Sequence, residues 1–111
     1  MIKTARLGYR ASAGEVAIDI TVKRNPKHVL SPTWDMVMAY IQNRITWEQY
    51  TERYLEILRK RWVSRRKEFN YLVRKAKYKT LILMCYCEDE KHCHRSLAKM
   101  VLDKVIEANE L

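Results

Sequence analysis

The chain has 111 residues, a length that predicts one domain spanning residues 1–111 with a single hydrophobic core. Hydrophobic residues make up 48% and charged residues 32%, with only two glycines and two prolines, which excludes a disordered or repetitive protein. The longest apolar run, from Leu81 to Cys87, is far shorter than the roughly 20 residues needed to cross a bilayer, so we expect no membrane partner.

The N-terminal segment and the cysteines both bear on the location of the protein. Residues 1–10, MIKTARLGYR, carry charges at positions 3, 6 and 10 and lack the apolar run of a secretory signal. The three cysteines are an odd number within nine positions, which suits reduced thiols better than a disulfide framework. We therefore predict a cytoplasmic protein without a structural disulfide.

The first half of the chain predicts two strands followed by two helices. Residues 2–7 form a short strand, and residues 16–22, VAIDITV, are typical of a strand that is covered on both faces. Ser31 is expected to cap a helix that begins at Pro32. Thr46 and Gln49 form a capping box at the start of the next helix.

The second half predicts two more helices, one on each side of a buried strand. Ser64 is the expected cap of the first, residues 80–87 form the strand, and the last helix follows Cys93. Strands alternating with helices favour the α/β class. We predict a small Rossmann-like three-layer domain with a short, mainly parallel sheet and about four helices.

The net charge of +9 is concentrated in one stretch, residues 59–79, which we name the basic segment. It holds ten basic residues and one acid, and basic and acidic residues balance elsewhere. One interpretation is electrostatic binding of nucleic acid without base specificity, and the other is a solvated helix face. The candidate nucleic-acid contacts are Arg59, Lys60, Arg61, Arg65, Arg66, Lys67, Arg74 and Lys75.

The richest chemistry lies in residues 85–97, CYCEDEKHCHRSL, between the last strand and the last helix. Ligands of parallel sheets bind at the carboxyl ends of strands, which here are the loops after Val22 and Cys87. His94 and Arg95 place positive charge in the first turn of the last helix, where the helix dipole disfavours cations. The compensating anion is either the acidic turn 88–90 or a ligand bound by Arg95, Ser96 and His94.

Cys93 allows three interpretations. Beside His94 and Arg95 at a helix N-terminus its thiol pKa should be lowered, which would suit a catalytic nucleophile, with His94 and Asp19 as acid/base groups. It could equally be a small buried hydrophobic residue. The third interpretation is a structural zinc site, although the spacing C-x-C-x5-C-H is not a standard finger. Its ligands would be Cys85, Cys87, Cys93 and either His92 or His94.

The stretch LILMCYCEDEKHCHRSLAKMVL, residues 81–102, resembles domain-of-unknown-function family 488, and residues 29–62 are similar to the middle helical section of that family. The resemblance implies a Rossmann-like sheet and no established reaction, with Cys85, Cys93, His94 and Arg95 as motif positions. The Asp-Val-Arg strand end of the family matches residues 19–21 here, where its arginine is absent. Lys23 or Arg24 is the candidate to replace that arginine, and Thr21 and Lys23 join Arg95 and Ser96 as the predicted anion contacts.

Together these patterns predict a pocket for a small anionic, nucleotide-like ligand at the strand ends. Nucleic-acid binding by the basic segment and a structural zinc site are the alternatives. The sequence leaves open whether the protein is an enzyme and whether it is a monomer or a homodimer.

Overall fold

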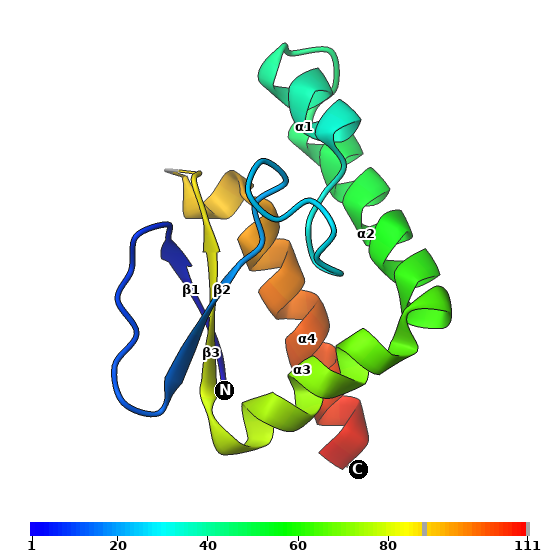
Figure 1. Cartoon of the computed structure of the whole chain (residues 1–111). Coiled ribbons are helices and arrows are strands. Elements are labelled where there is room, and N and C mark those ends of the chain that lie inside the picture. Colours follow the sequence, from blue (N-terminus) through cyan, green and yellow to red (C-terminus); the bar gives the residue numbers. More distant parts are fainter. Residues whose placement is uncertain (88, 111) are drawn as a thin grey trace.

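A parallel three-stranded sheet organises the protein, as the computed structural model of residues 1–87 and 89–110 shows (Figure 1). Its strands are β1 (Ile2–Arg6), β2 (Glu15–Asp19) and β3 (Thr80–Cys85), in the order β1-β3-β2. The central strand β3 is the most apolar of the three, and residues 81–83 are at most 2% exposed. Both neighbours pair with it in parallel, so the carboxyl ends of all three strands meet at one edge.

Four helices and one short 3-10 helix complete the fold. They are α1 (Trp34–Ile41), α2 (Trp47–Ser64), α3 (Arg66–Tyr78), η1 (Glu90–His92) and α4 (His94–Glu110). The predicted α/β class, parallel sheet and number of helices are confirmed among the described residues. None of the helices in this part of the chain has the length and apolar composition that a membrane crossing requires.

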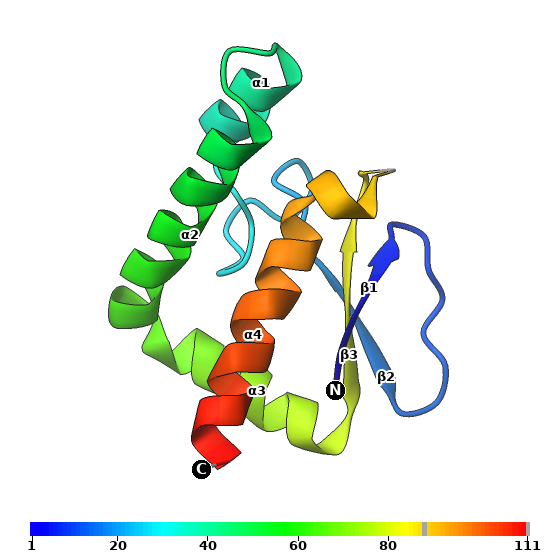
Figure 2. The same ribbon diagram turned by 180° about the vertical axis from the view of Figure 1, so that it is seen from behind.

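The helices all lie on one side of the sheet, as Figures 1 and 2 both show. The core forms between them, where Leu81 and Leu83 of β3 join Tyr54, Phe69 and Leu102 from three helices in one cluster. The other side of the sheet carries the connection 7–14 instead of the second helical layer that we predicted. This connection is too short for a helical crossover, which needs at least about 10–12 residues.

The helix starts show which capping predictions were right. The capping box at Thr46 is confirmed, because its hydroxyl accepts from Gln49 N at 3.1 Å and the Gln49 side chain accepts from Thr46 N at 2.9 Å. The cap predicted at Ser31 is wrong, since its hydroxyl donates to Asn25 O at 2.6 Å and Thr33 caps α1 instead. The cap predicted at Ser64 is also wrong, because this residue ends α2 and its hydroxyl donates to Lys60 O.

Thr46, which caps a helix, and Ser64, which does not, offer a matched test of capping. We expect Thr46→Ala to lower the free energy of unfolding by about 1 kcal/mol, because the Gln49 amide at the start of α2 loses its acceptor. Ser64→Ala should change it by less than about 0.5 kcal/mol, because an exposed bond back to the preceding turn adds little to a helix. Urea unfolding followed by circular dichroism measures both, and equal effects would contradict the assignment.

Candidate metal centre and adjoining pocket

The cysteine-rich stretch closes the edge of the sheet where the strands end. Figure 2 shows η1 and the start of α4 beside the carboxyl ends of β1 and β3. Cys85 is the last residue of β3, Cys87 follows it by two positions, and Cys93 and His94 form the junction between η1 and α4. The chain therefore returns to the strand end after the loop, and four side chains of soft ligand type come together.

The four side chains form a tight cluster, which we name the Cys/His cluster: Cys85, Cys87, Cys93 and His94. Their ligand atoms all lie within 4.8 Å of one another, and three of the four residues are buried. Cys85 Sγ lies 3.7 Å from Cys87 Sγ and 3.7 Å from His94 Nδ1. Zinc–sulfur bonds of about 2.3 Å and zinc–nitrogen bonds of about 2.0 Å at tetrahedral angles give edges of about 3.5–3.8 Å. The two separations of 3.7 Å fall within this range.

The ring of His94 is held in the orientation that a metal ligand needs. Its Nε2 lies 2.8 Å from Ile20 O, and because a carbonyl oxygen only accepts, Nε2 must carry a proton. In the neutral ring the lone pair is then on Nδ1, which faces the sulfur of Cys85. Tyr54 packs edge-on against the ring, with 5.7 Å between centroids. A ligating histidine typically donates its second ring N–H to an oxygen in this way.

The three thiols differ strongly in acidity. Hydrogen bonds from the Cys87 and Cys93 thiols hold the pKa of Cys85 well below its ordinary value, and His94 acts in the same direction. The same hydrogen bond raises the pKa of Cys87 to about 11. Hydrogen bonding to Cys85 and Cys87, together with burial, raises the pKa of Cys93, which is opposite to the lowered pKa that we predicted for a nucleophile. Cys93 is also only 1% exposed.

Arg95 is buried, and in the described residues its guanidinium contacts backbone carbonyls and not the acidic turn. Its Nη1 donates to the carbonyl oxygens of Ala5 at 3.3 Å, Cys85 at 3.3 Å and Cys87 at 3.0 Å. These carbonyls end β1 and β3, so the guanidinium neutralises the negative dipoles of the strand ends. Of the acidic turn, Asp89 contacts His92 at 3.3 Å, and Glu88 lies outside the described residues.

Of the other residues predicted to bind an anion or to act as acid/base groups, some line the pocket beside the Cys/His cluster and others do not. Ser96 donates its hydroxyl proton to Glu90 O at 2.6 Å. Asp19 accepts from both the backbone and the hydroxyl of Thr21, at 2.9 and 2.6 Å, and shapes the turn after β2. Thr21 and Lys23 line a pocket beside the Cys/His cluster, whereas Asp19, Arg95 and Ser96 are not part of its wall. The anion-binding role of these residues stays a prediction.

This pocket, of about 410 Å³, has the Cys/His cluster as one wall and aromatic rings as another. Its size is that of a small-molecule site. The sequence patterns single out none of the aromatic residues of this pocket, because helical periodicity does not distinguish a core face from a pocket wall. The aromatic lining residues are Trp34, Tyr40, Trp47, Tyr50 and Tyr86, together with His92.

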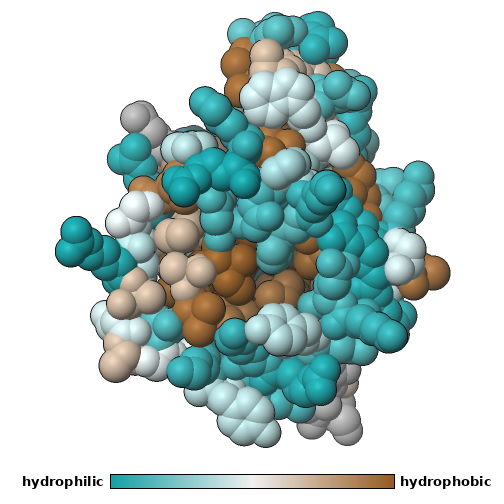
Figure 3. Space-filling model, viewed as in Figure 1, coloured by the Kyte–Doolittle hydropathy of each residue, from teal (hydrophilic) through white to brown (hydrophobic). Residues whose placement is uncertain are grey.

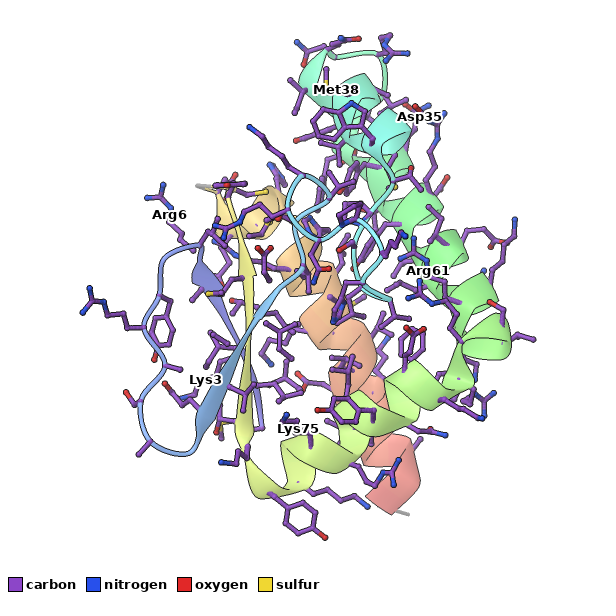
Figure 4. The ribbon with its side chains drawn as sticks, viewed as in Figure 1. Lys3, Arg6, Asp35, Met38, Arg61 and Lys75 are labelled. Carbon is purple, nitrogen blue, oxygen red and sulfur yellow. The ribbon has the colours of Figure 1, made fainter. Side chains whose placement is uncertain are left out.

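The basic segment lies on α2 and α3, in the hydrophilic region on the lower right of Figure 3. Part of it is engaged within the protein. Arg61 points from α2 toward the chain before α1 (Figure 4) and donates to the carbonyl oxygens of Val29 at 2.8 Å and Ser31 at 2.5 Å. Arg65 donates to Lys27 O and pairs with Glu68.

The remaining candidates are mostly on the surface. Arg59 pairs with Glu56 at 2.8 Å, Arg66 stacks on a tryptophan ring and the half-exposed Lys75 lies over a tyrosine ring. The other three candidates, Lys60, Lys67 and Arg74, are exposed.

Comparison with known proteins identifies the family of the chain. No curated protein and no solved structure matches the chain. The sequence does match the DUF488-N3a family, described as "Active DUF488-N3 subclade", over residues 2–105. Because this match covers nearly the whole chain, the protein belongs to the DUF488 family, and the resemblance seen in its sequence is confirmed.

Proposed function

We propose that the protein binds one zinc ion through Cys85, Cys87, Cys93 and His94. The observation that supports this best is the convergence of four soft ligand atoms within 4.8 Å, with His94 Nδ1 directed at the cluster by the bond from Nε2 to Ile20 O. Thiolate and imidazole ligands in a tetrahedral arrangement favour zinc over magnesium or calcium, which prefer oxygen. A neutral backbone carbonyl as the second partner of the histidine fits this role.

Four protein ligands make a closed site, so the zinc would be structural. It would join the end of β3 to the start of α4 and fix the loop between them. The same four residues form a wall of the 410 Å³ pocket, and the zinc would therefore also set the shape of that wall. All three cysteines are free thiols, and thiols stay reduced in the cytoplasm. We therefore propose a cytoplasmic location as well.

The two neighbouring histidines provide the test. We expect the purified protein to contain one zinc per chain, and His94→Gln to lose most of it, because an amide cannot replace the imidazole ligand. His92→Gln should keep the zinc, because His92 lies outside the cluster, where its ring packs at a tilt against Trp47, with 5.3 Å between centroids, and pairs with Asp89. Elemental analysis after dialysis against a weak chelator measures both. Metal loss in His92→Gln alone, or no metal in the native protein, would contradict the proposal.

A second candidate function is nucleic-acid binding by the basic segment, favoured by the exposure of Lys60, Lys67 and Arg74 on α2 and α3. Binding of this kind weakens as salt rises, with a slope set by the number of phosphates contacted. We expect duplex DNA to bind at low salt, and the triple change of these residues to Gln to reduce the slope of log K against log salt by about 2 to 3. Binding without a salt slope would exclude this function.

A further inference from the structure

We propose that the pocket beside the Cys/His cluster binds a small planar organic cation. The inference deepens the proposed zinc site and rests on it, because the charge of one pocket wall depends on the bound metal. It differs from the anionic ligand that the sequence predicts for this edge of the sheet. Three features of the pocket carry it: the charge of the cluster, the aromatic lining and an unpartnered hydroxyl.

The first feature is the negative charge of the metal-bearing wall. A zinc ion with three thiolates and a neutral histidine carries one net negative charge. His94 is neutral in this arrangement, because its Nε2 proton is bonded to Ile20 O and its Nδ1 would ligate the metal. All four ligand residues line the pocket, and three of them are buried. A charge in such a poorly solvated wall attracts a cation much more strongly than the same charge in water.

The second feature is the aromatic lining. Trp34 on α1 and Tyr86 after β3 are each 52% exposed, so large ring faces are open at the pocket. Trp47 and Tyr40 lie further along the same wall and contact each other edge to face, with 5.6 Å between centroids. Ring faces carry negative electrostatic potential and bind organic cations, most strongly where water is excluded. Flat rings on the wall also favour a flat ligand, which stacks on them.

The distribution of other charges leaves room for a cation. The described residues that line the pocket include no aspartate or glutamate, so the negative charge would come from the Cys/His cluster. The one lysine among them, Lys23, is exposed. Arg95, the nearest buried cation in sequence, is turned to the strand carbonyls instead. A cation in the pocket would therefore contact the negative wall and the ring faces, whereas the charge of Lys23 is screened by solvent.

The third feature is the hydroxyl of Tyr50. This residue lines the pocket and is only 4% exposed, yet among the described residues its hydroxyl has no hydrogen-bond partner. Its ring is fixed by stacking on Trp47 at 5.1 Å and on Tyr54 at 6.4 Å. The hydroxyl is not sealed from solvent, so a molecule in the pocket can bond to it without displacing a protein partner. The pocket thus has one polar group available to orient a bound molecule.

Three probes, each with one six-membered aromatic ring and one small substituent, test the sign of the charge: N-methylpyridinium (positive), toluene (neutral) and benzoate (negative). Saturation-transfer NMR on the zinc-loaded protein gives the dissociation constant of each. We expect N-methylpyridinium to bind about tenfold or more tightly than toluene, and benzoate to bind most weakly. Tighter binding of benzoate, or no preference for the cation, would overturn the inference.

Two surface variants make the test specific to this pocket. Trp34→Leu removes a half-exposed ring from the wall, and we expect it to weaken N-methylpyridinium binding about tenfold or more. Tyr78→Leu removes an 85% exposed ring elsewhere and should have no effect. Equal effects would show binding unrelated to the pocket. Zinc is measured in the same samples, so a zinc-loaded protein without cation preference rejects this inference alone, whereas a protein without zinc rejects the proposed function.

Discussion

If the proposed zinc is bound, chelating it is expected to lower the free energy of unfolding by about 4 kcal/mol or more. A ligand that binds only the folded state stabilises it by about 4 kcal/mol when its free concentration is a thousand times its dissociation constant. Structural zinc sites commonly exceed this affinity. For a domain of this size the loss corresponds to a fall in Tm of roughly 15 °C or more. Urea and thermal unfolding, with and without a zinc chelator, measure it.

Cys93→Ser provides the control for chelation. The buried Cys93 lies at the junction of η1 and α4, and serine is nearly the same size but is a poor zinc ligand. We expect the variant to be about as stable as the chelated native protein, and the chelator to change its stability no further. An equal response of the variant and the native protein to the chelator would show that the stability loss has another origin.

Arg95→Met is expected to lower the free energy of unfolding by about 3 kcal/mol. Methionine keeps much of the buried volume but removes the donor that serves the carbonyl oxygens of Ala5, Cys85 and Cys87. The Cys85 carbonyl keeps its bond from Leu7 N at 2.9 Å, so the carbonyls of Ala5 and Cys87 bear the loss, each at about 1.5 kcal/mol. Because these carbonyls end β1 and β3, the loss should loosen the strand ends first. Urea unfolding gives the total, and amide hydrogen exchange shows where protection falls.

Arg24→Met is the matched control for that substitution. Its side chain is 58% exposed and lies 3.4 Å from Asp19, and such surface ion pairs contribute little. We expect a change below about 0.5 kcal/mol. If Arg95→Met is equally neutral, the contacts to the strand carbonyls are not structural. Arg95 would then again be a candidate for the predicted anion contact.

Local sequence signals gave the correct fold class but not every helix boundary. The capping box at Thr46 was predictable because both of its partners lie within four residues of sequence. Ser31 and Ser64 have the right residue type for a cap, but their hydroxyls donate to the carbonyl oxygens of Asn25 and Lys60. Helix propensity does not reveal such a competing bond. The sequence also predicted helices on both faces of the sheet. The second face has none, because the connection 7–14 is too short to hold a helix.

The candidate site was predictable in its location but not in its contacts. The sequence supplied all four cluster residues, yet it left His92 and His94 as equal choices. The choice depends on the junction of η1 and α4, which turns His94 toward Cys85 and leaves His92 against Trp47. The positive charge of Arg95 at a helix start predicted an anionic partner, either the acidic turn or a ligand. In the structure its guanidinium contacts the nearby carbonyls of Cys85 and Cys87 and that of Ala5 in β1, a contact across 90 positions that no local pattern shows.

The most direct test of the zinc site is X-ray absorption spectroscopy of the metal-loaded protein. The expected result is one zinc surrounded by three sulfur atoms at about 2.3 Å and one nitrogen at about 2.0–2.1 Å. His94→Gln should remove the nitrogen shell with its imidazole scattering, while His92→Gln should leave the spectrum unchanged. A metal surrounded only by oxygen and nitrogen, or fewer than three sulfur ligands, would contradict the assignment of Cys85, Cys87, Cys93 and His94 as the zinc ligands.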